Sequence, residues 1–318
     1  MNSNYKYKNP WLGKVFQKLI GIDDAVEKLR PDIIVTREIF SPLSYQITKL
    51  NDSERFKHII YVDETTEINN SAWGLFPLTR KYAKYNACKN NYYISSSNKA
   101  MNSLLKIGID KEKIILVRIS IYTNKYLESQ TSDGGKFRIL FLGNLERNKG
   151  ILTILKAIRQ LRIKDLEFHF AGKGSLKDII IEESMKNNHI IYHGYVSETL
   201  KIDLLQKSNL FVYPSEDIML PFGIKRWEEQ GAISALEAMA SGLPVIGSDS
   251  GALPEIIEGN PIIKQGDSNS LAENIEILLS DEKMRKYLHQ YNMKRVRELY
   301  DIDKNKIKLK IYLTDVVV

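Results

Sequence analysis

The sequence predicts an α/β protein with two parallel-sheet domains. Short runs rich in β-branched residues alternate with longer helical patterns over nearly all of the 318-residue chain. This alternation is typical of β-α-β units, which form parallel sheets covered by helices on both faces. The length allows about two domains, each able to bury its own core.

Four strands are expected in the first third of the chain, followed by a polar linker. The strands are expected at 32–38, 58–64, 91–97 and 113–119. Residues 122–136 lose hydrophobic periodicity and contain a Gly-Gly pair among polar residues, so we interpret them as the interdomain linker. The first domain is therefore assigned to residues 1–130, joined by a C-terminal helix at 300–318.

Six further strands are expected in a second domain, at residues 131–299. They are expected at 137–143, 166–172, 189–195, 210–215, 244–249 and 261–265, and with their helices they form a complete nucleotide-binding layer structure. A helix is predicted from about Gly231, because residues 232–241 favour helix, Gly242 suits the position after a helix end, and Pro244 prevents continuation. The chain beyond Asp281 predicts one or two amphipathic helices.

Composition narrows the class of protein. Hydrophobic residues make up 43% and charged residues 27%, as in ordinary globular chains. The single Cys88 cannot form an internal disulfide, which favours a reducing, cytoplasmic location. No run approaches the roughly 18 apolar residues of a membrane span, and the N-terminus lacks a signal-peptide core, so neither spanning nor export is expected. The net charge of +7 favours anionic partners, but no motif indicates nucleic acid.

A basic apolar stripe lies near the N-terminus. Its apolar members, at helical spacing with Lys14 and Lys18 among them, are Trp11, Leu12, Val15, Phe16, Leu19 and Ile20. Such a helix can lie on an anionic membrane, which would give a peripheral membrane contact. The same pattern is also typical of a helix packed on its own domain, and both interpretations stay open.

Two glutamates flank the start of the helix expected near Gly231. A helix that begins at the carboxyl end of a parallel strand directs amide groups and a positive dipole end at a ligand, and a diphosphate would fit there without a metal ion. Glu237 can accept two hydroxyl hydrogen bonds, as a ribose diol offers, while Glu229 precedes the helix and can face a sugar. Alternatively, Glu229 is a helix N-terminal acid and Glu237 a partner for a surface lysine.

The wider sequence around these glutamates resembles a known enzyme family. Residues 214–257 contain, in order, a Pro-Ser strand end, EAMA, SG-PV and SDSG-PE. These blocks resemble the Glu-x7-Glu region of the family 4 retaining glycosyltransferases (glycosyl transferases group 1). Upstream, FRILFLGNLERNKG and EFHFAGKG resemble the family's first two strands and their loops, so the likeness covers about residues 137–280.

The resemblance implies a fold and a site. The fold is GT-B, with two Rossmann-like domains facing a cleft, and the N-terminal one is expected to be shortened because the family's opening strand and glycine-rich loop are not recognisable. Glu229 is the implied catalytic residue, with no metal and with a nucleotide-diphosphate sugar as co-substrate in place of any cofactor. The implied donor-binding residues are Gly143, Asn144, Arg147, Lys149, Gly172, His193, Gly194, Tyr195, Val196, Gly231, Ala232, Ile233 and Glu237.

Some of these positions depart from the family pattern. Asn144 stands where the family usually has Arg, and Arg147 is the candidate for the missing charge. Gly231 and Ala232 replace a Phe-Gly pair, and the longer preceding segment SEDIMLPFGIKR is expected to be a loop. Lys149 is expected to offer its ammonium to the diphosphate, although it could also be a solvent lysine at a helix start.

The expected reaction is retaining transfer of a sugar to a glycan, lipid-linked or small-molecule acceptor. Asp63, at the end of the strand at 58–64, is the candidate to face the acceptor hydroxyl, or else a solvated loop acid. A non-catalytic sugar-nucleotide-binding subunit, or one that needs a partner protein to complete the short first domain, is the alternative. A metal-binding Asp301-Ile302-Asp303 and a zinc pair of His189 and His193 are not favoured, because the first lies beyond the donor domain and the second lies on an expected strand.

Overall fold

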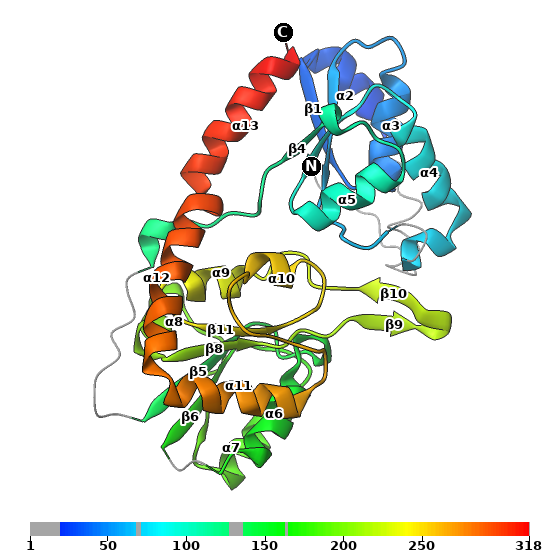
Figure 1. Ribbon diagram of the computed structural model, residues 1–318. Helices are drawn as coiled ribbons and strands as arrows, with labels where there is room; N and C mark the ends of the chain where they lie inside the picture. Colours follow the sequence, from blue (N-terminus) through cyan, green and yellow to red (C-terminus); the bar gives the residue numbers. More distant parts are fainter. Residues whose placement is uncertain (1–19, 68–70, 127–135, 163–164, 318) are drawn as a thin grey trace. The chain divides into compact units, whose positions relative to one another are not determined.

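The computed structural model describes residues 20–67, 71–126, 136–162 and 165–317, and its elements are labelled in Figure 1. The chain divides into two compact units. Unit 1 contains the residues up to Val117 together with Met219–Trp227 and Lys308–Val318. Unit 2 contains Arg118–Ile218 and Glu228–Ile307. The division falls between Val117 and Arg118, whereas the sequence suggested a boundary after residue 130.

Unit 1 is built on a four-stranded parallel sheet whose strands follow the chain order. Each strand lies inside a range expected from the sequence or within one residue of it: β1 (Ile33–Arg37), β2 (Lys57–Val62), β3 (Tyr92–Ser95) and β4 (Ile114–Leu116). The apolar runs of a parallel strand are covered on both faces, and Ile59, Ile60 and Val62 of β2 are accordingly buried.

Helices connect these strands and begin at recognisable caps. They are α2 (Ile22–Leu29), α3 (Pro42–Leu50), α4 (Pro77–Ala87) and α5 (Asn98–Lys106), with the short 3-10 helices η2 (Ala72–Leu75) and η3 (Lys111–Lys113). Ser41 and Ser97 accept hydrogen bonds from amides in the first turns of α3 and α5. Proline opens α3 and α4, where its missing amide costs nothing.

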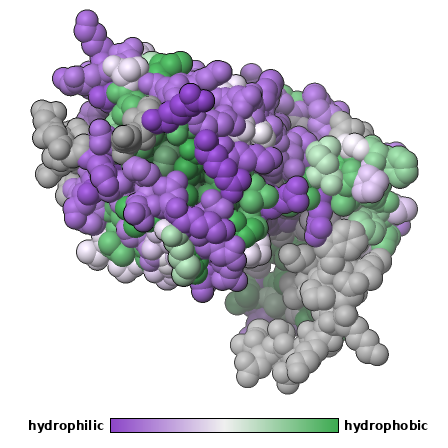
Figure 2. All heavy atoms as spheres, turned by 90° about the horizontal axis from the view of Figure 1, so that it is seen from below, coloured by the Kyte–Doolittle hydropathy of each residue, from purple (hydrophilic) through white to green (hydrophobic). Residues whose placement is uncertain are grey.

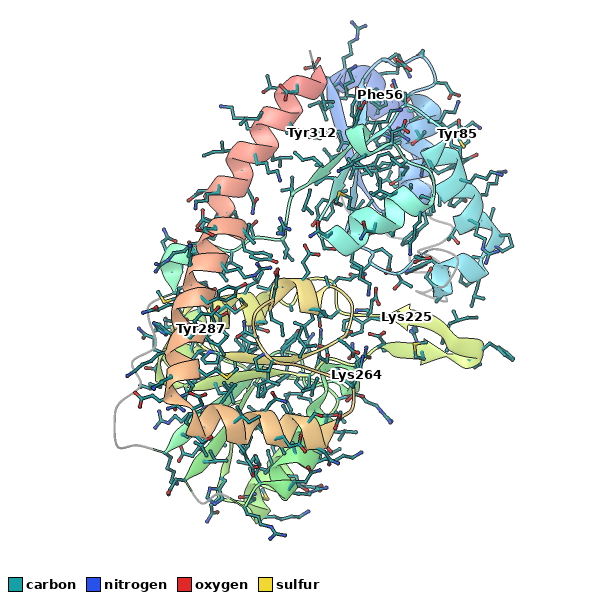
Figure 3. The ribbon with its side chains drawn as sticks, viewed as in Figure 1. Phe56, Tyr85, Lys225, Lys264, Tyr287 and Tyr312 are labelled. Atoms are coloured by element: carbon teal, nitrogen blue, oxygen red, sulfur yellow. The ribbon has the colours of Figure 1, made fainter. Side chains whose placement is uncertain are left out.

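The last helix of the chain, α13 (Ile302–Val317), ends in unit 1. Its apolar residues Leu309, Tyr312 and Val316 join a core cluster with Ile59 and Ile94 of the sheet. Tyr312 is labelled on this helix in Figure 3. A C-terminal helix at about this place was expected to join the first domain, and its apolar stripe explains why it packs there.

Unit 2 contains a six-stranded sheet with the order β12-β11-β8-β5-β6-β7, and its paired strands are all parallel. The strands are β5 (Phe137–Leu142), β6 (Leu166–Ala171), β7 (Ile190–Tyr192), β8 (Leu210–Tyr213), β11 (Val245–Ser248) and β12 (Ile262–Ile263). From β5 the chain builds outward to β7 and then returns to place β8 on the other side of β5. Ligands of open α/β sheets bind at such a switch point, outside the carboxyl ends of the strands.

The helices of unit 2 complete its layers (Figure 1). They are α6 (Ile151–Gln160), α7 (Lys177–Lys186), α8 (Glu198–Lys207), α9 (Ile233–Ala240), α10 (Leu253–Ile256), α11 (Ser268–Ser280) and α12 (Glu282–Leu299), with the 3-10 helices η4 (Thr123–Lys125) and η5 (Arg147–Lys149). The helix α9 ends as expected, because Gly242 adopts a left-handed conformation with φ 80° and Pro244 follows.

The segment expected as a long loop before Trp227 is instead a β-hairpin. Its strands are β9 (Ile218–Leu220) and β10 (Ile224–Trp227), joined through η6 (Pro221–Gly223). Phe222 and Gly223 both have positive φ, at 63° and 73°, which lets the chain reverse over three residues. Strands this short give too little alternation to be separated from a loop by pattern alone.

Other expectations fall on residues outside the described ranges. The predicted linker at 122–136 is described only at its ends, and of the N-terminal stripe only Ile20 is described. In the described part of the chain, every helix is too short or too polar to cross a membrane.

Candidate functional site

The candidate site lies where the carboxyl ends of β5 and β8 meet in unit 2. Lys149 closes η5 after β5, and Ser215 follows β8 by two residues. Gly150, which follows Lys149, has φ 71°, and a side chain there would overlap the carbonyl oxygen of Pro214. The Lys-Gly pair therefore lets the loop after β5 pack directly on the loop after β8.

Glu229 is the centre of this arrangement, and it is 5% exposed. Its Oε2 accepts hydrogen bonds from Lys149 Nζ at 2.5 Å and from Ser215 Oγ at 2.9 Å. Its Oε1 accepts one from the amide of Ala232 at 3.2 Å. The chain itself therefore holds the carboxylate in place, and the expectation that Glu229 faces a sugar stays a prediction.

These partners determine the charge of Glu229. Burial by itself would raise its pKa, but the Lys149 ammonium and the hydrogen bonds from Ser215 and Ala232 outweigh burial and lower it below its ordinary value. The carboxylate is therefore ionised at neutral pH. Together, Lys149 and Glu229 form a buried ion pair whose lysine side chain is 14% exposed.

The SDSG block positions the backbone of Glu229. Ser250 Oγ accepts a hydrogen bond from the Glu229 amide at 3.1 Å and donates one to Asp217 Oδ1 at 2.6 Å. The Glu229 carbonyl accepts from the amide of Ala252 at 2.7 Å. Gly251 has φ 52°, and a side chain there would overlap that carbonyl oxygen. The sequence predicted the motif but gave no role to Ser215, Asp217 or Ser250, whose partners are distant in the chain.

The helix α9 begins two residues later than Gly231. Ala232 precedes its first turn in a left-handed conformation, with φ 34° and ψ 50°, and is 3% exposed. Ile233, the first helical residue, is 48% exposed, so this helix end is partly open to solvent. The first amides of a helix have no partner within it and form a positive end that favours an anion.

Glu237 lies one turn into α9 and is also buried. Its Oε1 accepts hydrogen bonds from Tyr126 Oη and from Lys201 Nζ, both at 2.6 Å. Burial raises the pKa of Tyr126, and the Glu237 carboxylate raises it further. Of the two interpretations of Glu237, the lysine partner is present in this structure, although Lys201 is itself mostly covered, with 16% of its side chain exposed.

Backbone hydrogen bonds connect the loops that follow β5, β6 and β7. The amide of Gly143 donates to Ala171, and that of Gly172 donates to Gly194. His193 stacks on His169, with 2.9 Å between His193 Nε2 and His169 Nδ1.

The remaining predicted donor residues differ in exposure. Asn144 and Arg147 are exposed, and Tyr195 is 78% exposed. Val196 packs against the core.

The other predicted acid, Asp63, lies in unit 1 at the end of β2. It forms an ion pair with Arg37 at the end of β1. Beside it, Glu38 Oε1 accepts hydrogen bonds from the amides of Asp63 and Glu64, both at 3.2 Å. Burial, and next the Asp63 side chain, raise the pKa of Glu38 well above its ordinary value. The pKa of Asp63 lies below its ordinary value, because the Glu38 and Arg37 side chains together outweigh burial.

The described residues contain no group of three or more His, Cys, Asp or Glu side chains arranged to hold a metal ion. His189 and His193 flank β7, and the Nδ1 of His189 lies 2.8 Å from the carbonyl oxygen of Leu166. Asp301 bonds to Thr123 and to the first amides of α13. These three residues therefore have structural partners.

Comparison with solved structures shows the fold. The chain is similar to the lipopolysaccharide outer core galactosyltransferase WaaB, with a TM-score of 0.71 and 14% identity over 93% of this chain and 78% of that one. It is also similar to HepE of Anabaena, solved in complex with UDP-glucose, with a TM-score of 0.71 and 14% identity over 94% and 84% of the two chains. The GT-B fold prediction is confirmed.

Sequence comparison gives the family. The chain is 33% identical over 173 residues to an uncharacterised glycosyltransferase, MJ1607, of Methanocaldococcus jannaschii. The match covers 52% of this chain and 41% of that one, so the chain spans less than half the length of this relative. The family profile described as glycosyl transferases group 1 matches residues 123–295, a range that begins near the start of unit 2 and includes Lys149, Glu229 and Glu237. By this match the chain belongs to the glycosyl transferases group 1 family.

Proposed function

We propose that this chain is a retaining glycosyltransferase that moves a sugar from a nucleotide-diphosphate sugar to an acceptor hydroxyl. The observation that carries the proposal is the buried cluster of Lys149, Ser215 and Glu229 at the switch point between β5 and β8, beside the start of α9. Family membership and the likeness to HepE, which was solved with UDP-glucose, support this choice of donor.

The sugar-transfer reaction depends mainly on electrostatic stabilisation by the protein. The bond from the anomeric carbon to the diphosphate breaks, and its electron pair stays on the phosphate oxygen. The acceptor oxygen forms the new bond and passes its proton to the departing phosphate oxygen, and retention places this bond on the face that the diphosphate left. Positive charge grows on the sugar while negative charge grows on the diphosphate, so fixed charges that match both ends lower the barrier.

Lys149 and the first amides of α9 would hold the diphosphate in this proposal. Lys149 belongs to the loop after β5, and Arg147 in the same loop is exposed and able to approach a phosphate. An arriving diphosphate competes with Glu229 for Lys149. When the ammonium moves to the phosphate, the ionised Glu229 is left to favour positive charge on the sugar.

The nucleoside would lie over the loops after β6 and β7. Backbone groups of residues 193–196 would contact the base, with Gly143 and Gly172 allowing close approach of the chain. Glu237 would accept the ribose hydroxyls, and to do so it would share or exchange its bonds to Tyr126 and Lys201. We propose no cofactor beyond this co-substrate.

The acceptor is proposed to be a glycan, a lipid-linked sugar or a small molecule. A relative that is 27% identical over 52% of this chain is the capsular polysaccharide biosynthesis glycosyltransferase CapM of Staphylococcus aureus, which favours polysaccharide or glycolipid synthesis. Asp63 is the proposed acceptor-side residue. Its ionised state suits a hydrogen bond from an acceptor hydroxyl.

The test is hydrolysis of sugar nucleotides by the purified chain, measured after a thermal-shift screen of UDP-, GDP- and ADP-sugars has selected a donor. Glu229→Ala should abolish hydrolysis while nucleotide affinity stays within a few-fold. The matched control is Glu228→Ala, which removes the neighbouring buried glutamate. Hydrolysis that survives Glu229→Ala would overturn the role of Glu229. Activity that appears only after a second protein is added would favour a partner-dependent subunit.

A further inference from the structure

The β9–β10 hairpin carries an apolar tip that its own unit leaves exposed. Phe222 is 99% exposed and Met219 51% exposed, and they flank Leu220 and Pro221 at the turn. Figure 2 shows an apolar patch at the right-hand end of the view, where the hairpin of Figure 1 lies. Water contact of this kind is unfavourable for large apolar side chains, and a cluster of them marks an interaction site.

The hairpin base is anchored while its tip is not. Lys225 of β10 forms a parallel bridge with Ser71, and β10 lies against η2 in the same unit. Leu75 of η2 is 50% exposed and adds to the apolar surface beside the hairpin. Phe222 has a left-handed backbone conformation, with φ 63°, and its almost complete exposure shows that its ring packs on neither strand.

The charge of the hairpin indicates which kind of partner its tip binds. Residues 218–227 contain two cations, Lys225 and Arg226, and no acid. Figure 3 places Lys225 on β10, a few residues behind the apolar turn. An aromatic and aliphatic tip followed by basic residues matches the boundary between the acyl chains and the headgroups of an anionic bilayer.

The size of the tip argues against a stable protein partner. A standard protein interface buries about 800 Å² on each side. This area far exceeds what the exposed side chains of Met219, Pro221 and Phe222 supply. Insertion into a bilayer needs no matching surface, since each apolar side chain gains by leaving water on its own.

We propose that the hairpin tip, residues 219–224, inserts into the interface of an anionic lipid bilayer while Lys225 and Arg226 contact the headgroups. The whole protein thereby binds the membrane surface peripherally. The insertion is independent of the transfer reaction, so either proposal can fail alone.

The first experiment measures co-sedimentation of the full chain with phosphatidylcholine vesicles, with and without phosphatidylglycerol. We expect binding to the anionic vesicles, weakened by salt. Phe222→Ser should weaken binding about tenfold, because an inserted phenylalanine loses much of its transfer free energy. Tyr287→Ser is the matched control, since Tyr287 is an exposed aromatic residue, 62% exposed, on α12. Equal binding by Phe222→Ser and the unaltered chain would overturn the proposal.

A second experiment follows the tip directly. Cys88 is the chain's single cysteine, so Phe222→Cys in a Cys88→Ser background can carry one environment-sensitive dye. Its fluorescence should rise and shift to the blue on anionic vesicles, while the same dye at Tyr287→Cys should not change. No change at position 222, or a change that instead tracks self-association of the chain, would contradict insertion.

Discussion

Glu38 of unit 1 and Glu229 of unit 2 occupy comparable places, and their pKa values are shifted in opposite directions. Both lie near the carboxyl ends of parallel strands, and each accepts a hydrogen bond from a backbone amide. Lys149 holds Glu229 ionised, whereas Glu38 lies beside the Asp63 carboxylate and has a raised pKa. Topology brings an acid to the strand ends and burial raises the pKa of both acids, but the charge of the nearest neighbour decides in which direction each pKa finally moves.

The largest expected effect comes from removing that neighbour in unit 2. Lys149→Met should lower turnover by about 10²–10³-fold, because the cation proposed to hold the diphosphate is lost. Glu229 should then titrate at a higher pH, since Lys149 is the main influence that opposes its burial. The acid limb of the pH–rate profile should move upward accordingly.

The matched control for this change is Lys156→Met, at an exposed position on the neighbouring α6. It should leave turnover and the pH profile unchanged. If a Lys149→Met variant keeps its rate within a few-fold and the acid limb of its pH–rate profile does not move, Lys149 neither binds the diphosphate nor lowers the pKa of Glu229.

The comparison is sharpest when both acids receive the same neutral substitute. Glu229→Gln should destabilise unit 2 by about 3 kcal/mol at pH 7, since it leaves the Lys149 ammonium buried without its counter-charge. Glu38→Gln should cost less, because the pKa of Glu38 is raised well above its ordinary value and glutamine keeps the shape of the side chain without a charge. Hydrogen exchange of β5 amides for the first variant and β2 amides for the second measures each unit separately.

The sign of the pH dependence offers a further check on these two variants. The raised pKa of Glu38 means that its contribution to stability is present at low pH and is lost as pH rises through the folded-state pKa. The lowered pKa of Glu229 means the reverse, with stability lost as pH falls through its folded-state value. The comparison would be refuted if the free energy of unfolding changed with pH in the same direction through both residues.

Much of the fold could be predicted because its signals are local. All ten strands expected from the β-branched runs are present, and Gly242 and Pro244 ended α9 as predicted. The hairpin at 218–227 was mistaken for a loop, since its three- and four-residue strands gave no usable alternation. Unit 1 also takes in residues 219–227, a long-range association that no local pattern encodes, whereas the C-terminal helix was expected to join this unit.

The candidate site was less predictable, because its contacts join distant residues. The motif blocks of unit 2 indicated Lys149 and Glu229 as site residues. They did not predict the ion pair between the two, which are 80 positions apart in the sequence. The contact of Tyr126 with Glu237 spans 111. In unit 1 the sequence named Asp63 and missed Glu38, whose raised pKa depends on burial that periodicity does not reveal.

Unit 1 should lose stability in mild acid through a buried histidine. His58 is fully buried among the side chains of Thr36, Thr48 and Asn91, and burial lowers its pKa to about 4. The unfolded chain takes up this proton near pH 6.5 while the folded chain does not, so stability falls as pH drops from about 6.5 to about 4. The loss should reach about 2 kcal/mol at pH 5.

Hydrogen exchange of β2 amides at pH 7.5 and 5 measures this loss in unit 1. His58→Gln removes the titrating group and should flatten the dependence, even if it lowers stability at both pH values. If the loss of stability between pH 7.5 and 5 is unchanged in that variant, other groups cause the acid sensitivity.

The smallest expected effect concerns the second acid of α9. Tyr126 Oη donates to Glu237 Oε1, the same oxygen that Lys201 contacts, so Tyr126→Phe removes one of two partners without removing the charge pair. If ribose hydroxyls bind Glu237, the vacated position becomes available to the nucleotide, and its affinity should rise or stay constant while unit 2 loses about 1 kcal/mol of stability. Tyr122→Phe, at a 44% exposed position nearby in the chain, is the control for both measurements. A fall in nucleotide affinity beyond tenfold would mean that Tyr126 itself contacts the nucleotide, and Glu237 would then serve to position that tyrosine rather than the ribose.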